Sequence, residues 1–323
     1  MNQEAAVLVG DVGGTHARFA VVETDPFRVT DQLELAADDF ESFDATLAAY
    51  LGYLGLKRPR AAAIGVAGPV TAGRVSFTNR DWHASEEGLH KLGFERALLI
   101  NDFAAAAFSV TALRPEDVRS IGPQLDSIAD EPITILGAGT GFGVSCLARF
   151  RGASLPIATE GGHVSFSPQN GEQREVLRIL AARFGHVSVE RVLSGPGLTN
   201  LHGALSEMAG KNPATLHAAE ITQQAEDGEE ISAAALDMFC AIFGAVAGDF
   251  ALAHGARGGV YIAGGIARKI ESTLARSAFR AAFENKGRLS YYVQAVPTRL
   301  ILNEDSAFLG AALALERFGV SRG

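Results

Sequence analysis

The sequence has little cysteine and no excess of basic residues. Cys146 and Cys240 are its two cysteines, and no Cys-x-x-Cys pair occurs. Two isolated thiols cannot build a disulfide framework or a cysteine zinc site, and such cysteine use is typical of the reducing cytosol. The formal net charge is −9 and no run of lysine or arginine occurs, which argues against nucleic acid or an anionic membrane as a partner. An anionic nucleotide would need local hydrogen-bond donors and a metal.

Long apolar runs are also lacking. The longest, residues 238–248, is bracketed by Asp237 and Asp249 and falls short of the roughly 20 residues that span a bilayer, so we predict a buried helix. The N-terminal MNQEAAVLVGDV carries an acidic residue where a signal peptide would be basic. We therefore expect no targeting segment and a cytoplasmic location.

The chain is long and apolar enough for two domains. It has 323 residues with 47% hydrophobic content, and its 36 glycines are spread along it. An apolar helix predicted over Ala307–Phe318, after the strand-like Leu300–Leu302, could return to the first lobe. We predict a small α/β domain of residues 1–112 plus 303–323, and a large α/β domain of residues 113–302.

One pattern, an apolar strand, a glycine turn and a second apolar strand, occurs twice. The first copy spans Ala5–Gly10, the turn Asp11–Thr15, and Ala17–Val22; the second spans Ile133–Gly137, the turn Ala138–Gly141, and Phe142–Leu147. The echo of DVGGT in GAGTG suggests two duplicated lobes. Apolar periodicity predicts further strands over Ala61–Val66, Ala97–Ile100 and Val260–Ile262, and helices over Phe103–Val110, Arg174–Phe184, Val189–Leu193, Ala214–Ala225 and Ile231–Ala253.

Both glycine turns are suited to binding phosphate. Successive amides in a glycine turn make a concave anion site, and Gly13-Gly14-Thr15 and Gly137–Gly143 both have this composition. Neither is a Walker A loop, since no Gly-Lys-Ser/Thr follows, and neither is a dinucleotide fingerprint, since each runs into a strand. An ordinary hairpin turn explains either one alone equally well. Two such turns, both with threonine, favour phosphate binding.

Asp11, at the head of the first turn, could order a magnesium ion or its water shell; a plain turn residue is the alternative. Gly264-Gly265 would let a nucleotide base or ribose lie against the backbone, and a glycine pair at a helix start explains it nearly as well.

Asn101-Asp102 lies between a predicted strand and a predicted helix. Helix capping alone explains this pair. A carboxylate at the carboxyl end of a strand also faces the usual ligand edge of an α/β sheet, where it could accept a proton during phosphoryl transfer. Glu160 and His163 flank two glycines and could bind vicinal hydroxyls, although a lone histidine in a loop is more often structural. Glu190 by itself is best explained as a helix N-terminal glutamate.

Seven motifs in order resemble the bacterial glucokinase family of the actin/hexokinase/Hsp70 superfamily. They run over nearly the whole chain: VGDVGGTHARFAVVE (9–23), NDFAAAAF (101–108), GAGTGFGV (137–144), TEGGHVSF (159–166), HVSVERVLSGPGL (186–198), GGVYIAGGI (258–266) and FRAAFENKGR (279–288).

The resemblance implies a two-lobed α/β, ribonuclease-H-like (actin/hexokinase-type) fold with an interdomain cleft, and ATP- and Mg²⁺-dependent phosphorylation of glucose at its 6-hydroxyl. It implies Asp102 as general base, glucose as substrate and a homodimer. The implied glucose ligands are Asn101, Asp102, Glu160, His163 and Glu190. The implied nucleotide site comprises Gly10, Asp11, Val12, Gly13, Gly14, Thr15, Gly137, Gly139, Thr140, Gly141, Gly264 and Gly265, with Asp11 reaching Mg²⁺ through water.

Two departures from the family pattern bear on affinity and sugar choice. His16 stands where members commonly carry Asn, and Ala67-Gly68-Pro69 stands where some relatives have Cys-Pro. The cysteine-rich zinc motif of the related repressor/kinase group is absent from the sequence, so zinc is not expected. The alternatives are a kinase for another hexose or an N-acetylated amino sugar, a non-catalytic sugar sensor, and an actin- or chaperone-like ATPase.

Overall fold

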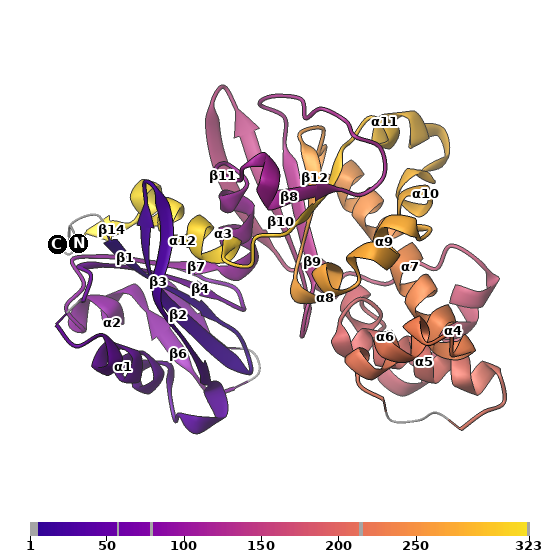
Figure 1. The fold of residues 1–323 in the computed structure, drawn as a ribbon, viewed down its shortest axis with the longest axis horizontal. Helices are drawn as coiled ribbons and strands as arrows, with labels where there is room; N and C mark the ends of the chain where they lie inside the picture. Colours follow the sequence, from indigo (N-terminus) through magenta and orange to yellow (C-terminus); the bar gives the residue numbers. More distant parts are fainter. Residues whose placement is uncertain (1–5, 57, 78–79, 213–215, 322–323) are drawn as a thin grey trace. The chain divides into compact units, whose positions relative to one another are not determined.

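The computed structural model describes residues 6–56, 58–77, 80–212 and 216–321, and it has a mixed α/β fold (Figure 1). The chain divides into two compact units. Unit 1 comprises Met1–Arg114, Ser154–Ala158 and Asn303–Gly323, and unit 2 comprises Pro115–Ala153 and Thr159–Leu302.

Unit 1 is built on a six-stranded sheet with the order β14-β7-β4-β1-β2-β3. Strands β1 and β2 form an antiparallel hairpin, whereas β1, β4 and β7 run parallel. The central strands are buried almost throughout, as expected for a sheet with helices on both faces. The strands span β1 Ala6–Val12, β2 His16–Thr24, β3 Phe27–Ala36, β4 Ala61–Val66, β7 Arg96–Asn101 and β14 Val320–Ser321, and Arg74–Ser76 (β5) pairs with His83–Ser85 (β6) in a separate ribbon.

Helices cover both faces of this sheet. On one face, α1 (Phe43–Leu54) and α2 (Glu86–Lys91) bury their apolar sides against the strands. On the other, α3 (Asp102–Ser109) and α12 (Ser306–Phe318) pack against each other and the sheet (Figure 1). A Cβ on Gly310 would overlap the carbonyl oxygen of Ala105, so only glycine permits this close approach of α12 to α3.

Five strands of the sheet in unit 2, β11-β10-β9-β12-β13, repeat the order β3-β2-β1-β4-β7 of unit 1. The full order of this sheet is β11-β10-β9-β12-β13-β8, with an antiparallel β9/β10 hairpin and parallel β9, β12 and β13. The two glycine hairpins therefore occupy equivalent places in two similar sheets, as the repeated pattern in the sequence suggested. The strands span β8 Val118–Ser120, β9 Ile133–Ala138, β10 Phe142–Phe150, β11 Ala153–Thr159, β12 Gly259–Ala263 and β13 Thr298–Ile301. Strand β11 belongs to this sheet by its pairing, although its residues Ser154–Ala158 are grouped with unit 1.

The core of unit 2 is organised around one long helix, α7 (Glu230–His254). This helix is long and apolar enough to cross a membrane, but 72% of its most apolar window is buried inside the structure, and it packs against α5, α6 and α10. The predicted buried helix is thus confirmed. The other helices are α4 Gly171–Phe184, α5 Gly195–Met208, α6 Ala218–Glu226, α8 Gly265–Lys269, α9 Glu271–Arg276, α10 Phe279–Glu284 and α11 Ser290–Gln294, and 3-10 turns span η1 Ala37–Asp39, η2 Pro115–Asp117, η3 Gly161–His163, η4 Val189–Arg191 and η5 Gly287–Leu289.

One predicted helix is wrong, and one helix was missed. The helix predicted over Val189–Leu193 is only the 3-10 turn η4, and α5, which follows it, was not predicted. The Gly195-Pro196-Gly197 start resembles a loop, yet proline fits the first helical turn and Ser194 caps the helix by accepting from the Gly197 N–H. The predicted start of the next helix at Ala214, and Ala5 of the first strand, lie outside the described residues.

Candidate active site

In unit 1, three parallel strands end in one row. Strand register places Val12 opposite Val66, and Val66 opposite Asn101. The segments that follow these strands therefore emerge at the same edge of the sheet: the first glycine turn, Ala67-Gly68-Pro69, and Asp102. Parallel strands place their carboxyl ends, the usual ligand edge of an α/β sheet, together.

Asn101 is the cap of α3, and Asp102 is the first residue of the helix. The Asn101 Oδ1 accepts from the Ala104 N–H at 3.0 Å, while its Nδ2 donates to the Gly68 carbonyl at 3.3 Å. The Asp102 Oδ1 accepts from the Phe103 N–H at 2.8 Å. Capping is thus done by Asn101, and the half-buried Asp102 carboxylate lies at the ligand edge of the sheet.

The first glycine turn is held in place by hydrogen bonds to its backbone. The Gly13 N–H donates to the His16 carbonyl at 2.9 Å, and the Thr15 carbonyl accepts from the Ala37 N–H at 2.9 Å. The Gly14 carbonyl accepts from the guanidinium of Arg80. Arg80 is 66 residues from Gly14 in the sequence, so no local pattern indicates this contact.

Asp11 is paired with an arginine. Its Oδ2 lies 2.5 Å from Nη2 of Arg18, and the Arg18 guanidinium lies 5.3 Å from the centre of the Phe308 ring. Burial lowers the pKa of Arg18, but the charge and hydrogen bond of Asp11, together with the charges of Asp305 and Glu34, outweigh this and raise the pKa above its ordinary value. Asp11 is therefore more than a turn residue, and Arg18 is a second residue that the sequence pattern did not reveal.

In unit 2, the second glycine turn and Gly264-Gly265 share a sheet edge. Register pairs Gly137 with Ala263 on the neighbouring parallel strand. A Cβ on Gly137 would overlap the Ala263 carbonyl, and one on Gly264, whose φ is +92°, would overlap the Ala138 carbonyl. These two glycines are required by close backbone packing whatever ligand binds, whereas a Cβ on Gly139 or Gly265 would meet open space.

The predicted sugar-binding residues of unit 2 gather beside this turn. Glycines let η3 pack onto β10, since a Cβ on Gly162 would overlap the Phe142 carbonyl. Segments η3 and η4 are joined by a hydrogen bond from the Val189 N–H to the Val164 carbonyl at 2.9 Å. The exposed side chains of Glu160 and His163 come within 3.9 Å of each other.

Glu190 contacts the second glycine turn directly. Its Oε2 accepts a hydrogen bond from the Phe142 N–H at 2.8 Å, and a Cβ on Gly141 would overlap that oxygen. The Gly195 N–H, at the start of α5, donates to the Gly139 carbonyl at 2.9 Å. The turn is therefore held by Glu190 on one side and by α5 on the other.

Each unit thus holds part of the predicted ligand set. Unit 1 brings together Asp11, the turn Gly13-Gly14-Thr15, Asn101 and Asp102. Unit 2 brings together the second turn, Gly264-Gly265, Glu160, His163 and Glu190. Carboxylates and an imidazole can bind hydroxyl groups, and glycine amides can bind phosphate. Within the described ranges, no group of three or more His, Cys, Asp and Glu could hold a metal ion.

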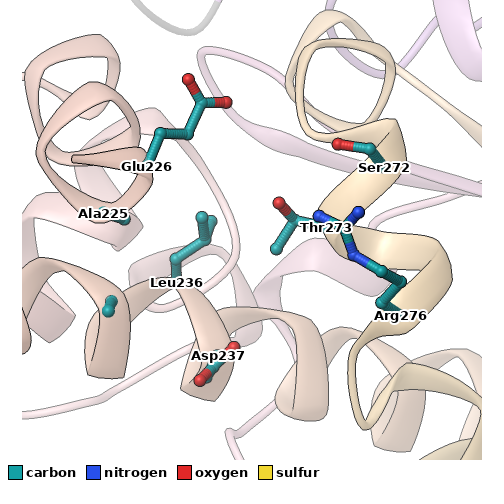
Figure 2. Close-up of a pocket in the computed structure, with 8 residues that line it drawn as sticks. Ala225, Glu226, Leu236, Asp237, Ser272, Thr273 and Arg276 are labelled. Carbon is teal, nitrogen blue, oxygen red and sulfur yellow. The ribbon is translucent and has the colours of Figure 1, made fainter. Parts of the chain in front are cut away.

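A separate cavity of about 440 Å³ lies between α6, α7 and α9 of unit 2 (Figure 2). Glu226 and Asp237 contribute carboxylates to it, and Arg276 contributes a guanidinium. None of the predicted site residues lines this cavity. It is lined by Ala225, Glu226, Ala233, Leu236, Asp237, Ser272, Thr273 and Arg276.

Comparison with known proteins agrees with the motifs. The family model described as Glucokinase matches residues 8–318. A glucokinase of Caulobacter sp. (strain K31) is 45% identical over 319 residues, covering 98% of this chain and 96% of the relative. The crystal structure of a glucokinase from an Antarctic psychrotroph aligns with a TM-score of 0.84 and 36% identity, covering 97% of this chain and 99% of the other.

A more distant structure extends the likeness in fold. The ROK family glucokinase from Streptomyces griseus, solved in complex with glucose and AMPPNP, aligns with a TM-score of 0.69 at 18% identity, covering 97% of this chain and 99% of the other. The neighbours share the actin/hexokinase-type fold implied by the sequence motifs. By its motifs, its fold and its relatives, the chain belongs to the glucokinase family.

Proposed function

We propose that this chain transfers the γ-phosphoryl group of ATP to the 6-hydroxyl of glucose, with Asp102 as general base. The observation that supports this role best is the position of Asp102. Its carboxylate follows β7 at the sheet edge where β1 delivers the first glycine turn. A proton acceptor and a phosphate-binding turn on one edge are what phosphoryl transfer to an alcohol requires.

Asp102 accepts the proton of the sugar hydroxyl as the phosphoryl group is transferred. Because the transition state is loose, deprotonation comes late and an ordinary carboxylate suffices. Asn101, Glu160, His163 and Glu190 bind the other hydroxyls and orient the sugar. The glycine turns direct backbone N–H groups at the phosphates and stabilise the developing charge. Gly264-Gly265 lie beside the second turn and accommodate the adenosine.

Magnesium fits this site through water. Arg18 occupies one carboxylate oxygen of Asp11, so the second oxygen is the one that would hold a metal-bound water. When bound with ATP, Mg²⁺ neutralises phosphate charge. Removal of Mg²⁺ with EDTA should abolish turnover while glucose binding measured by calorimetry persists.

Asp102→Asn tests the role of the base. Asparagine keeps an Oδ1 that can accept from the Phe103 N–H, so the start of α3 is preserved. We expect kcat to fall by roughly 10²–10⁴-fold, the usual range for loss of a general base, with the Kd for glucose little changed. Asp39→Asn, at an exposed carboxylate of the same unit, is the matched control. Turnover like that of the wild type in Asp102→Asn would refute the assignment.

Glucose as the preferred sugar is tested by a substrate panel. Hydroxyl-binding side chains such as Glu160 and His163 do not by themselves fix stereochemistry. A coupled ATP-consumption assay should give the highest kcat/KM for glucose among glucose, fructose, mannose and N-acetylmannosamine. A higher value for another sugar would make the chain a kinase for that sugar, and ATP hydrolysis indifferent to every hexose would indicate an ATPase.

The assembly and location of the enzyme are further parts of this proposal. We expect a cytoplasmic homodimer with no nucleic-acid or membrane partner, and light scattering on a sizing column tests the dimer. We also expect domain boundaries at residues 112/113 and 302/303, where limited proteolysis should cleave first.

A further inference from the structure

Arg80 binds the backbone of the first glycine turn through its guanidinium group. Its Nε and Nη2 donate to the Gly14 carbonyl at 3.0 and 2.7 Å, and its Nη1 donates to the Ala37 carbonyl at 2.9 Å. The planar guanidinium thus joins two backbone carbonyls that are distant in the sequence. Nη2 also lies 2.7 Å from Oδ1 of Asp38.

The guanidinium is itself held in place by aromatic packing. The Arg80 side chain is only 16% exposed, and its guanidinium carbon lies 4.7 Å from the centre of the Trp82 ring. Trp82 is buried and meets the Phe77 ring edge-on at 6.0 Å. Asp38 is 89% exposed, so that ion pair contributes little. The stacking and the carbonyl bonds determine where Arg80 lies.

Fixing the Gly14 carbonyl also fixes an amide. In a trans peptide, the C=O of one residue and the N–H of the next point in opposite directions. The Gly14 carbonyl points toward Arg80, so the Thr15 N–H points to the opposite side of the turn. Rotation of this peptide would replace that donor with a carbonyl oxygen, which repels phosphate.

We propose that Arg80 is a positioning residue for ATP, which aims the Thr15 N–H at the nucleotide phosphates by holding the Gly14 carbonyl. The inference rests on the proposed function, in which the first glycine turn binds phosphate. Arg80 itself acts through the turn and needs no contact with the substrate. Its guanidinium also offsets the negative end of the Gly14 carbonyl dipole.

Lysine cannot replace arginine in this role. A guanidinium presents several N–H donors in a fixed plane and stacks on an aromatic ring, whereas an ammonium is a compact, strongly hydrated charge. The Gly14 and Ala37 carbonyls are bound by different nitrogens of the same plane. Arg80→Lys therefore keeps the charge but loses the geometry.

The test measures KM for ATP and for glucose separately in Arg80→Ala and Arg80→Lys. We expect KM for ATP to rise about tenfold in Arg80→Ala, comparable to losing one hydrogen bond to a charged group, with KM for glucose within about twofold. Arg80→Lys should recover less than half of this loss. Arg96→Ala is the matched control, since Arg96 donates to the Leu315 carbonyl at 2.7 Å elsewhere in unit 1.

The outcomes separate the inference from the proposed function. Glucose phosphorylation by the wild type tests the proposed function, whereas the ratio of variant to wild-type KM tests Arg80. Calorimetric titration with AMPPNP gives the same ratio without turnover. An unchanged affinity for ATP in Arg80→Ala, an equal rise in both KM values, or full recovery by lysine would each overturn the inference. A lower Tm with an unchanged KM for ATP would make Arg80 merely structural.

Discussion

The carboxylate of Glu190 accepts a hydrogen bond from the backbone N–H of Phe142 at 2.8 Å. Phe142 is the first residue of β10, directly after the second glycine turn. A side chain proposed to bind the sugar is therefore attached to a turn proposed to bind phosphate. A carboxylate that accepts from a backbone N–H restrains that segment through a charge-assisted bond.

Glu190→Ala should therefore weaken the binding of both substrates. Loss of the carboxylate removes a proposed hydroxyl partner and releases the Phe142 N–H, so we expect KM for glucose and KM for ATP each to rise by about tenfold or more. Glu160→Ala is the matched variant, because Glu160 is exposed and pairs with His163. It should raise KM for glucose alone. An equal rise in KM for ATP in Glu190→Ala and Glu160→Ala would show that the Phe142 contact has no functional role.

Asn101→Ala should lower both the stability of the protein and its affinity for glucose. The side chain caps α3, and loss of such a cap costs about 1 kcal/mol, which urea unfolding followed by circular dichroism will detect. KM for glucose should rise as well, because the side chain is also a proposed ligand. Ser42→Ala removes the cap of α1, whose Oγ accepts from the Ala45 N–H at 3.1 Å. It should lower stability equally and leave KM for glucose unchanged.

Alanine at two glycines of the second turn should affect different properties, stability at Gly137 and ATP binding at Gly139. Gly137→Ala places a methyl group against the Ala263 carbonyl, and overpacking of this kind costs about 1–3 kcal/mol or more, so Tm should fall. Gly139→Ala meets no atom within 4 Å, so Tm should hold while KM for ATP rises, because the methyl group crowds the proposed phosphate site. A normal KM for ATP in Gly139→Ala would count against phosphate binding there.

Stability should fall below neutral pH because of His254. Its Nδ1 lies 2.8 Å from Oγ1 of the buried Thr134, and burial lowers the pKa of His254 below its ordinary 6.5. As the pH falls, the unfolded chain therefore binds a proton on this histidine near pH 6.5, whereas the folded chain binds it only at the lowered pKa. The stability that neutral His254 contributes is present above pH 6.5 and is lost as the pH falls through the lowered pKa.

We expect the urea midpoint to decrease from pH 7.5 to pH 5.5 in the wild type, and to decrease less in His254→Gln. His83→Gln, at an exposed histidine, should retain the full wild-type pH dependence. An identical pH dependence of the urea midpoint in all three proteins would rule out His254 as the cause of the loss of stability at low pH.

The strands beside the glycine turns were predictable because short runs of buried apolar residues continue almost without interruption. The predicted Ala61–Val66 strand matches β4 in full, and Ala307–Phe318 differs from α12 by one residue. Helix α5 was missed because its Gly-Pro-Gly start has loop composition, although Ser194 and Pro196 fit an N-terminus once the helix is known. Local composition thus predicts elements well where apolar periodicity is regular.

The contacts that hold the candidate site were not predictable from local sequence. Arg80 lies 66 residues from Gly14, and Glu190 lies 48 residues from Phe142. A long side chain that binds a distant backbone group leaves no spacing signal, because its partner is a peptide group that every residue carries. From its neighbours alone, Glu190 reads as a helix N-terminal residue. Its role as a sugar ligand, like those of Asn101 and Asp102, stays a prediction.

The packing of α12 on α3 ties the proposed base to the order of protein synthesis. Residues 306–318 leave the ribosome after every residue of unit 2, yet they cover one face of the sheet in unit 1 and fit closely onto the helix that begins at Asp102. Domains generally fold as units during translation, the earlier one first. Here the unit that is begun first is completed last, because α12 is synthesised after every residue of unit 2.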